Sequence, residues 1–180
     1  MINNIYLDTL NSEDMEMLRK WRNENTKQGI YRTPYLLTYN MQRDFFNNII
    51  NNRNLNSRYF GIYLNEMDTI KTFVGYCGLD KIEWENGLAE IALTIGKNYV
   101  GKSYGSTALE LLLIEAFNNM RLYNIYGECY KCNPNLAFWE KMIEKYGAYR
   151  TILPARKFYD NHIWDSIFFN FNYYDWVVDK

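Results

Sequence analysis

Apolar and polar positions follow short, regular patterns over the first half of the chain. Residues 5–10 alternate between the two kinds, as in a strand with one buried face. Apolar side chains recur at helical spacing in residues 15–22 and again in residues 40–52, which predicts two helices. Turn residues then separate three strand-like runs, which predict an antiparallel meander. These runs are residues 59–64, 69–79 and 88–95.

The second half of the chain returns to helical spacing and ends in strand-like runs. Residues 108–117 carry apolar side chains at i, i+3 and i+4, which predicts a helix packed against the meander. A strand over residues 123–130 and a helix over residues 135–145 should follow. Residues 149–152 and 163–171 can then form a closing hairpin. The predicted order is one strand, two helices, three strands, a helix, a strand, a helix and two strands.

The length and composition fit one globular domain over residues 1–180. Hydrophobic residues make up 48% of the chain and prolines number only 3, which argues against a disordered protein. No apolar run approaches the roughly 20 residues of a membrane helix, and the N-terminus lacks a signal-peptide pattern, so we expect a cytoplasmic protein. The net charge of −1, with both signs interspersed, favours a small-molecule partner over nucleic acid or a membrane.

The three cysteines, Cys77, Cys129 and Cys132, are expected to be reduced thiols. Cys129 and Cys132 form a Cys-x-x-Cys but lack the second pair that a zinc ribbon supplies, so no metal is expected. The lone His162 should have a structural or surface role. The 17 tyrosines and 5 tryptophans must mostly pack, although some can line a pocket for a planar or sugar-bearing substrate.

A glycine-bearing loop before the helix at residues 108–117 has two interpretations. Residues 96–103, Gly-Lys-Asn-Tyr-Val-Gly-Lys-Ser, match the P-loop pattern G-x-x-x-x-G-K-[ST]. A P-loop protein also needs an acidic residue at the end of an apolar strand to hold magnesium, and we find no convincing one. Too little sequence follows for the parallel strands and crossover helices of such a domain. A P-loop nucleotide-binding protein is therefore kept only as an alternative.

The second interpretation shifts the frame to residues 101–106, Gly-Lys-Ser-Tyr-Gly-Ser. This segment resembles motif A of the GNAT N-acetyltransferases, Q/R-x-x-G-x-G/A, and especially the G-K-G-Y-G of their ribosomal-protein N-terminal acetyltransferase branch. Helix N-terminal amides suit a pyrophosphate, so the resemblance implies acetyl-coenzyme A as co-substrate, without a metal. It assigns cofactor binding to Val100, Gly101, Lys102, Ser103, Tyr104, Gly105 and Ser106. Val100 replaces the family's Arg or Gln, and Ser103 replaces its middle glycine.

Other segments extend this resemblance over nearly the whole chain. Residues 18–23, Leu-Arg-Lys-Trp-Arg-Asn, resemble the first helix of the branch, and residues 74–79 resemble its third strand. Residues 133–141 and 146–148 resemble the family segment that follows the fifth strand, and Trp164-Asp165 matches the opening of its last strand. The resemblance implies the GNAT fold, an α/β (α+β) domain. In that fold about four helices flank a mixed, mostly antiparallel sheet of about seven strands.

The implied reaction is transfer of an acetyl group to a primary amine by direct attack. Glu90 is our expected general base because the family's base often lies on this strand, and Glu128 on the neighbouring strand is the second choice. The family's usual acid is a tyrosine, but the aligned residue is Trp139, whose indole does not titrate usefully. Tyr126, Tyr130 or water can protonate the thiolate, or acid catalysis is dispensable.

The resemblance also assigns further contacts to the cofactor and the acceptor. Backbone groups of Leu93, Thr94 and Ile95 should meet the pantetheine arm and the thioester. Asn133 should steady the cofactor, unless it only caps a helix. The expected acceptor residues, for which ordinary packing is the alternative role, are Trp21, Arg22, Tyr31, Arg32 and Tyr35.

The acceptor itself is left open by the sequence. An amino-sugar nucleotide, a polyamine, an aminoglycoside and a protein N-terminus all suit the family, and the protein is expected to be a monomer or a homodimer. A non-catalytic acyl-coenzyme-A-binding sensor is a further alternative, because the tyrosine is missing and the loop is altered.

Overall fold

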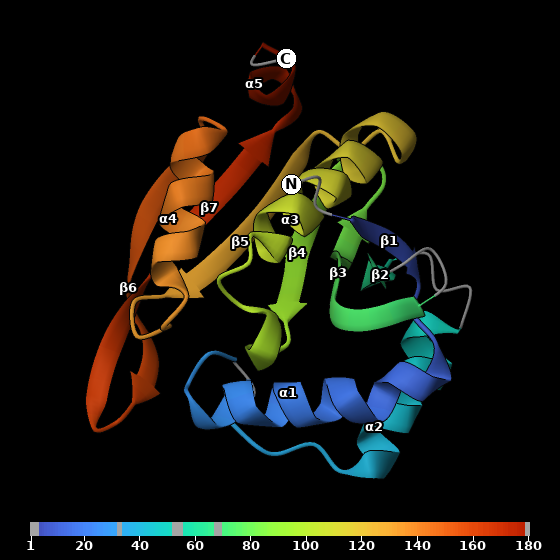
Figure 1. The fold of residues 1–180 in the computed structure, drawn as a ribbon. Helices are drawn as coiled ribbons and strands as arrows, with labels where there is room; N and C mark the ends of the chain where they lie inside the picture. Colours follow the sequence, from blue (N-terminus) through green and yellow to red (C-terminus); the bar gives the residue numbers. More distant parts are fainter. Residues whose placement is uncertain (1–3, 32–33, 52–55, 67–69, 179–180) are drawn as a thin grey trace.

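The computed structural model describes residues 4–31, 34–51, 56–66 and 70–178, and it contains a seven-stranded sheet. The strands run in the order β1-β2-β3-β4-β5-β7-β6 (Figure 1). The strands are β1 Ile5–Thr9, β2 Arg58–Glu66, β3 Ile70–Glu83, β4 Leu88–Ile95, β5 Asn124–Tyr130, β6 Tyr149–Tyr159 and β7 His162–Asn172. This sheet confirms the predicted number of strands and the predicted meander.

The described α-helices match the four predicted helices and add a short one at the C-terminal end. The α-helices are α1 Met15–Lys27, α2 Tyr39–Phe45, α3 Tyr104–Ile114, α4 Leu136–Lys145 and α5 Tyr173–Val178. Short 3-10 segments lie at Ser12–Asp14 and Lys97–Tyr99, and π-helical turns extend α2 over Phe46–Ile50 and α3 over Glu115–Asn119. Asn52 and Thr69, at predicted element ends, lie outside the described residues.

The pairing of β4 with β5 is the feature that positions the site. All other neighbouring strands are antiparallel, whereas β4 and β5 run parallel. Their register joins Leu88 through Glu90 to Asn124 through Tyr126, yet β4 continues to Ile95 and β5 to Tyr130. Figure 1 shows the two strands separating toward their C-terminal ends. The sheet is therefore open at this point, where backbone groups of β4 are available to a ligand.

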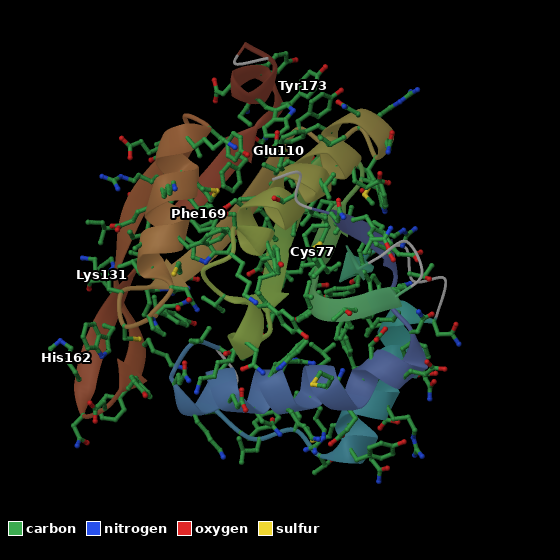
Figure 2. All side chains as sticks on the ribbon, in the orientation of Figure 1. Cys77, Glu110, Lys131, His162, Phe169 and Tyr173 are labelled. Carbon is green, nitrogen blue, oxygen red and sulfur yellow. The ribbon has the colours of Figure 1, made fainter. Side chains whose placement is uncertain are left out.

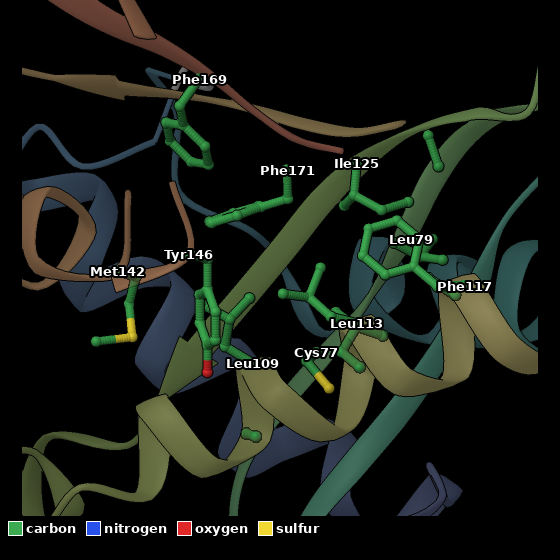
Figure 3. Close-up of a cluster of buried hydrophobic side chains, with 14 of the residues drawn as sticks. Cys77, Leu79, Leu109, Leu113, Phe117, Ile125, Met142, Tyr146, Phe169 and Phe171 are labelled. Carbon is green, nitrogen blue, oxygen red and sulfur yellow. The ribbon is translucent and has the colours of Figure 1, made fainter. Parts of the chain in front are cut away.

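Helices cover both faces of the sheet, and the alternation of side chains along β3 separates two clusters. Cys77 belongs to the main core, where it meets the fully buried Leu109 and Leu113 of α3 (Figure 3). Its neighbour Tyr76 belongs to a second cluster with Leu18 of α1. Because successive strand residues point to opposite faces, α3 and α1 lie on opposite sides of the sheet.

Candidate functional site

A cavity of about 610 Å³ lies where the end of β4, the start of α3, the start of α4 and the second half of α1 meet. Most of the residues predicted to bind the cofactor line its wall. They are Leu93, Thr94, Ile95, Val100, Gly101, Ser103, Tyr104, Gly105, Ser106 and Asn133. Trp21 and Tyr31, from the predicted acceptor set, line it too. The described wall does not include Lys102, Arg22 or Tyr35, and Arg32 lies outside the described residues.

The loop before α3 has the backbone geometry of an anion site. Gly101 has φ +83° and lies in open space, with nothing within 4 Å of the position a side chain would take. The first amides of a helix have no partner within the helix, and they carry its positive dipole end. At Gly105 a side chain would meet Phe138 at 3.4 Å and Ile95 at 3.6 Å. The first turn of α3 thus presents its free amides to the cavity, and no side chain at Gly105 covers them.

Ser103 takes a left-handed conformation, with φ +62° and ψ 8°, at the start of α3. Left-handed backbone costs an L-residue roughly 1–2 kcal/mol, and glycine avoids this cost. We therefore expect Ser103→Gly to raise the free energy of unfolding by up to about 1 kcal/mol in urea denaturation. Ser106→Gly, inside the first turn of α3, is the matched control and should lower it by about 0.5–1 kcal/mol. If the two variants lowered the free energy of unfolding equally, the backbone at Ser103 would not be strained.

The first glycine of the literal P-loop match has a packing role. A side chain at Gly96 would lie 2.4 Å from the Trp21 indole, so only glycine lets α1 approach the end of β4 so closely. The Trp21 ring also stacks on Phe73 with centroids 5.2 Å apart and meets Tyr99 edge-on at 6.5 Å. Trp21 therefore fixes α1 against the sheet while also lining the cavity.

Tyr31 links the segment after α1 to the cavity side of β4. Its hydroxyl lies 2.6 Å from the hydroxyl of Thr94, and Lys157 donates to its carbonyl at 2.6 Å. Burial, and then the nearby Tyr76, raise the pKa of Tyr31 far above its usual value. The phenol is therefore neutral near pH 7, where it serves as a hydrogen-bonding group but is a poor proton donor.

The three predicted acid–base residues lie outside this cavity wall. Glu90 sits in the paired part of β4, opposite Tyr126, and its carboxylate contacts the Lys81 ammonium at 2.6 Å. The side chain of Glu128 is only 5% exposed, and it accepts from Arg156 at 2.9 Å and from Ser166 at 2.7 Å. Tyr130 is buried, with the Lys157 ammonium 5.3 Å from its ring centroid. Their catalytic roles stay predictions.

Among the described wall residues the acidic one is Glu24 of α1, which was not predicted from the sequence as a site residue. It shares the wall with Trp21 and Asn25 of the same helix and with Gln28, which directly follows the helix. These positions follow the spacing i, i+3, i+4 and i+7, so one face of α1 borders the cavity. That spacing was visible in the sequence, although it did not show which helix face borders a ligand.

The segment around α4 also lines the cavity, and two of its wall residues, Trp139 and Asn133, were expected at the site. Trp139 stacks on Phe169 at 4.9 Å and meets Phe138 edge-on at 5.1 Å, which fixes its ring in place. The side-chain oxygen of Asn133 accepts from the amide of Asn135 at 2.9 Å, so it shapes the turn that leads into α4. The N-cap of α4 is Asn135, so Asn133 does not cap the helix; its role toward the cofactor stays a prediction, with its place on the cavity wall.

The cysteines and the histidine lie apart from this wall. All three cysteines are free thiols, and burial raises the pKa of Cys129 to about 12. His162 is exposed at the start of β7, with its ring 4.7 Å from that of Trp164, and Figure 2 shows it near the tip of the β6–β7 hairpin. In the described part of the chain, no three His, Cys, Asp or Glu side chains gather as metal ligands would. No described helix has both the length and the apolar character to cross a membrane.

Comparison with known proteins gives a family and a fold. The model of the acetyltransferase (GNAT) domain matches residues 4–148. The uncharacterized N-acetyltransferase p20 of Bacillus licheniformis is 36% identical over 66 residues, which are 37% of this chain and 35% of that protein. The matched segment thus spans about a third of this relative's length.

Solved structures share the fold over almost the full chain. The spermidine N-acetyltransferase of Vibrio cholerae, solved in complex with CoA and spermine, superposes with a TM-score of 0.83 at 18% identity. The superposition covers 97% of this chain and 98% of that one. A putative acetyltransferase from T. thermophilus superposes with a TM-score of 0.70 at 17% identity, covering 97% and 89% of the two chains.

Proposed function

The chain belongs to the GNAT acetyltransferase family, and on that premise we propose that it transfers the acetyl group of acetyl-coenzyme A to a primary amine. The observation that carries this proposal is the position of the cavity. It joins the separating end of β4 to the amide-bearing start of α3, with α1 on its other side. An acetyl-transfer site must hold the phosphates and thioester of the donor on one side and the attacking amine on the other. The cavity can do both, because β4 and α3 form one part of its wall and α1 forms another.

The phosphate end of the donor fits the start of α3. Free amides and the helix dipole there favour an anion, and Lys97 and Lys141 add positive charge to the same cavity. Val100 provides no side-chain donor, so backbone amides hold the pyrophosphate. The pantetheine arm fits the free edge of β4, where an amide in the segment from Leu93 to Ile95 can donate to the thioester oxygen as negative charge develops.

The residues of the wall favour direct attack of the amine on the thioester, with water supplying the proton for the coenzyme A thiolate. Trp139 occupies the place of the family tyrosine and its indole does not titrate usefully. Tyr31 is held neutral by burial, so it is too weak an acid to protonate a thiolate. Its hydroxyl instead orients Thr94 and closes the acceptor side of β4. We expect coenzyme A to leave as a thiolate that solvent protonates.

Two acceptor classes have independent support. The motif at residues 101–106 resembles the ribosomal-protein N-terminal acetyltransferase branch, which supports an N-terminal amine. The fold is shared with a spermidine N-acetyltransferase, which supports a small diffusible amine. Both are primary amines that must be uncharged at the moment of attack.

Ligand-dependent unfolding and thiol release test this function together. Coenzyme A at one hundred times its dissociation constant should stabilise the protein by about 2.7 kcal/mol, and ATP with magnesium should not. Acetyl-coenzyme A with a panel of amines should release free thiol. Stabilisation by ATP with magnesium alone would support a P-loop protein instead. Tight binding of acetyl-coenzyme A without turnover on any amine class would support a sensor.

A further inference from the structure

The cavity wall carries charged side chains of both signs. Its basic side chains are Lys97, just after β4, and Lys141, on α4. Glu24 of α1 is the sole acidic side chain among the wall residues that the structure describes. A helix C-terminus carries partial negative charge, and Glu24 lies in the last turn of α1. The α1 side is therefore the side that suits a cation.

We infer that Glu24 receives the ammonium group of the acceptor, and that the acceptor is a compact monoamine rather than a polyamine. This inference rests on the proposed acetyl transfer and names the substrate class of the same site. Asn25 and Gln28 flank Glu24 on the wall with neutral amides, which suit hydroxyl or carbonyl groups on the rest of the acceptor.

The support for Glu24 is rigid. Trp21, one turn earlier on the same helix face, is fixed between Phe73 and Tyr99 and against Gly96. The backbone carbonyl of Glu24 accepts from the amide of Gln28 at 3.2 Å, so the helix is intact at this position. A carboxylate on a fixed helix holds the ammonium in one place relative to β4. The nitrogen attacks the thioester carbonyl after it has given one proton to water in the cavity, and the C–S bond then breaks to release the thiolate.

The other carboxylates near the sheet are already engaged. Glu90 is paired with Lys81, and Glu128 with Arg156. For Glu24, in contrast, the structure shows no side-chain ion pair or hydrogen bond with a described residue, and the carboxylate is exposed at the cavity. It is therefore available to a ligand.

The number of acidic side chains on the described wall favours a monoamine over a polyamine as the acceptor. One carboxylate balances one ammonium, and the described wall offers no acidic partner to a second or third ammonium. Lys97 and Lys141 repel additional positive charge within the same cavity. Spermidine would therefore bind with unpaired charge, whereas an amino sugar such as glucosamine presents one ammonium and several neutral hydroxyl groups.

Steady-state kinetics with glucosamine and spermidine test the inference. The wild type should have a kcat/KM for glucosamine about tenfold above that for spermidine. Glu24→Gln should lower kcat/KM for glucosamine about tenfold, mainly through the KM for the amine, and Glu24→Asp should restore part of it. Glu13→Gln removes the same charge from an exposed residue outside the cavity. It should leave kcat/KM unchanged for glucosamine and for spermidine.

The same variants distinguish failure of the inference from failure of the proposed function. Stabilisation by coenzyme A should be equal in the wild type and Glu24→Gln, because the residue lies away from the phosphate end. A preference for spermidine, or glucosamine kinetics that Glu24→Gln does not alter, overturns the inference while acetyl transfer stands. A wild type that neither binds coenzyme A nor acetylates any amine overturns both.

Discussion

Replacing Gly105 by glutamate should abolish binding of coenzyme A and, with it, acetyl transfer. A side chain at this position points toward Phe138 and Ile95 on the cavity wall. It would place a carboxylate among the amides expected to hold the pyrophosphate. Two like charges about 5 Å apart repel by about 3 kcal/mol at an effective dielectric constant near 20, which corresponds to a loss of affinity of at least about a hundredfold. Calorimetric titration with coenzyme A measures this loss.

Thr107→Glu is the matched control for the charge. Thr107 lies two residues later in α3 and is outside the described cavity wall. Glutamate in the first turn of a helix suits the dipole, so stability should be kept. The affinity for coenzyme A should fall by less than about tenfold, because the added carboxylate points away from the cavity. Similar losses in the two variants would mean that general charge around α3, rather than the Gly105 position, governs binding.

The largest effect on stability is expected for Phe169→Ala. Phe169 is 1% exposed on β7 and packs against Trp139 and Phe171, with ring centroids 4.9 Å and 5.5 Å away. Removing a buried phenylalanine ring costs about 3–5 kcal/mol, because hydrophobic burial is lost and a cavity is left. The Trp139 ring also loses its support, so binding of coenzyme A should weaken. Urea denaturation followed by fluorescence gives the free energy of unfolding.

Phe158→Ala is the same chemical change at an exposed position. Phe158 is 69% exposed on the edge strand β6, so its loss should cost less than about 1 kcal/mol. A difference of at least about 2 kcal/mol between the variants is expected. If Phe169→Ala lowered the free energy of unfolding as little as Phe158→Ala does, the stacked aromatic rings between β7 and α4 would contribute little to the core.

Features set by local sequence were predicted correctly. Helix α3 follows from the spacing of Leu109, Leu112 and Leu113, all fully buried, since a helix face is defined within a few turns. The turn before α3 could be placed in the same way, because Gly101 and the helix start lie within one short segment. Its role in cofactor binding stays a prediction. The structure adds the left-handed backbone of Ser103, which has no signal in a single sequence unless glycine is present.

Features set by tertiary contacts were not predictable. Strand β6 was expected to end at Ile152, but it continues past Pro154 through an irregular register around Ala155, which has φ 54°. Proline at an edge strand is tolerated because its missing donor faces away from the ladder. Helix α5 has only six residues, too few for a periodic pattern, and buries Trp176.

The carboxylates proposed for the site show the same limit of prediction from sequence. Strand alternation correctly placed Glu90 on one face of β4, but it could not show that Lys81 pairs with it nine residues away or that the site opens further along the strand. Glu24 was equally visible as a charged residue on a helix. Its proximity to the cavity depends on how α1 packs across the end of β4, which Trp21 and Gly96 decide.

A crystal structure of the complex with coenzyme A would show where the acetyl donor binds. We expect the pyrophosphate against the amides of residues 101–106, the pantetheine arm along Leu93 to Ile95, and the thiol facing Glu24 across the cavity. Coenzyme A bound at another surface, with this cavity empty, would rule out the cavity as the donor site.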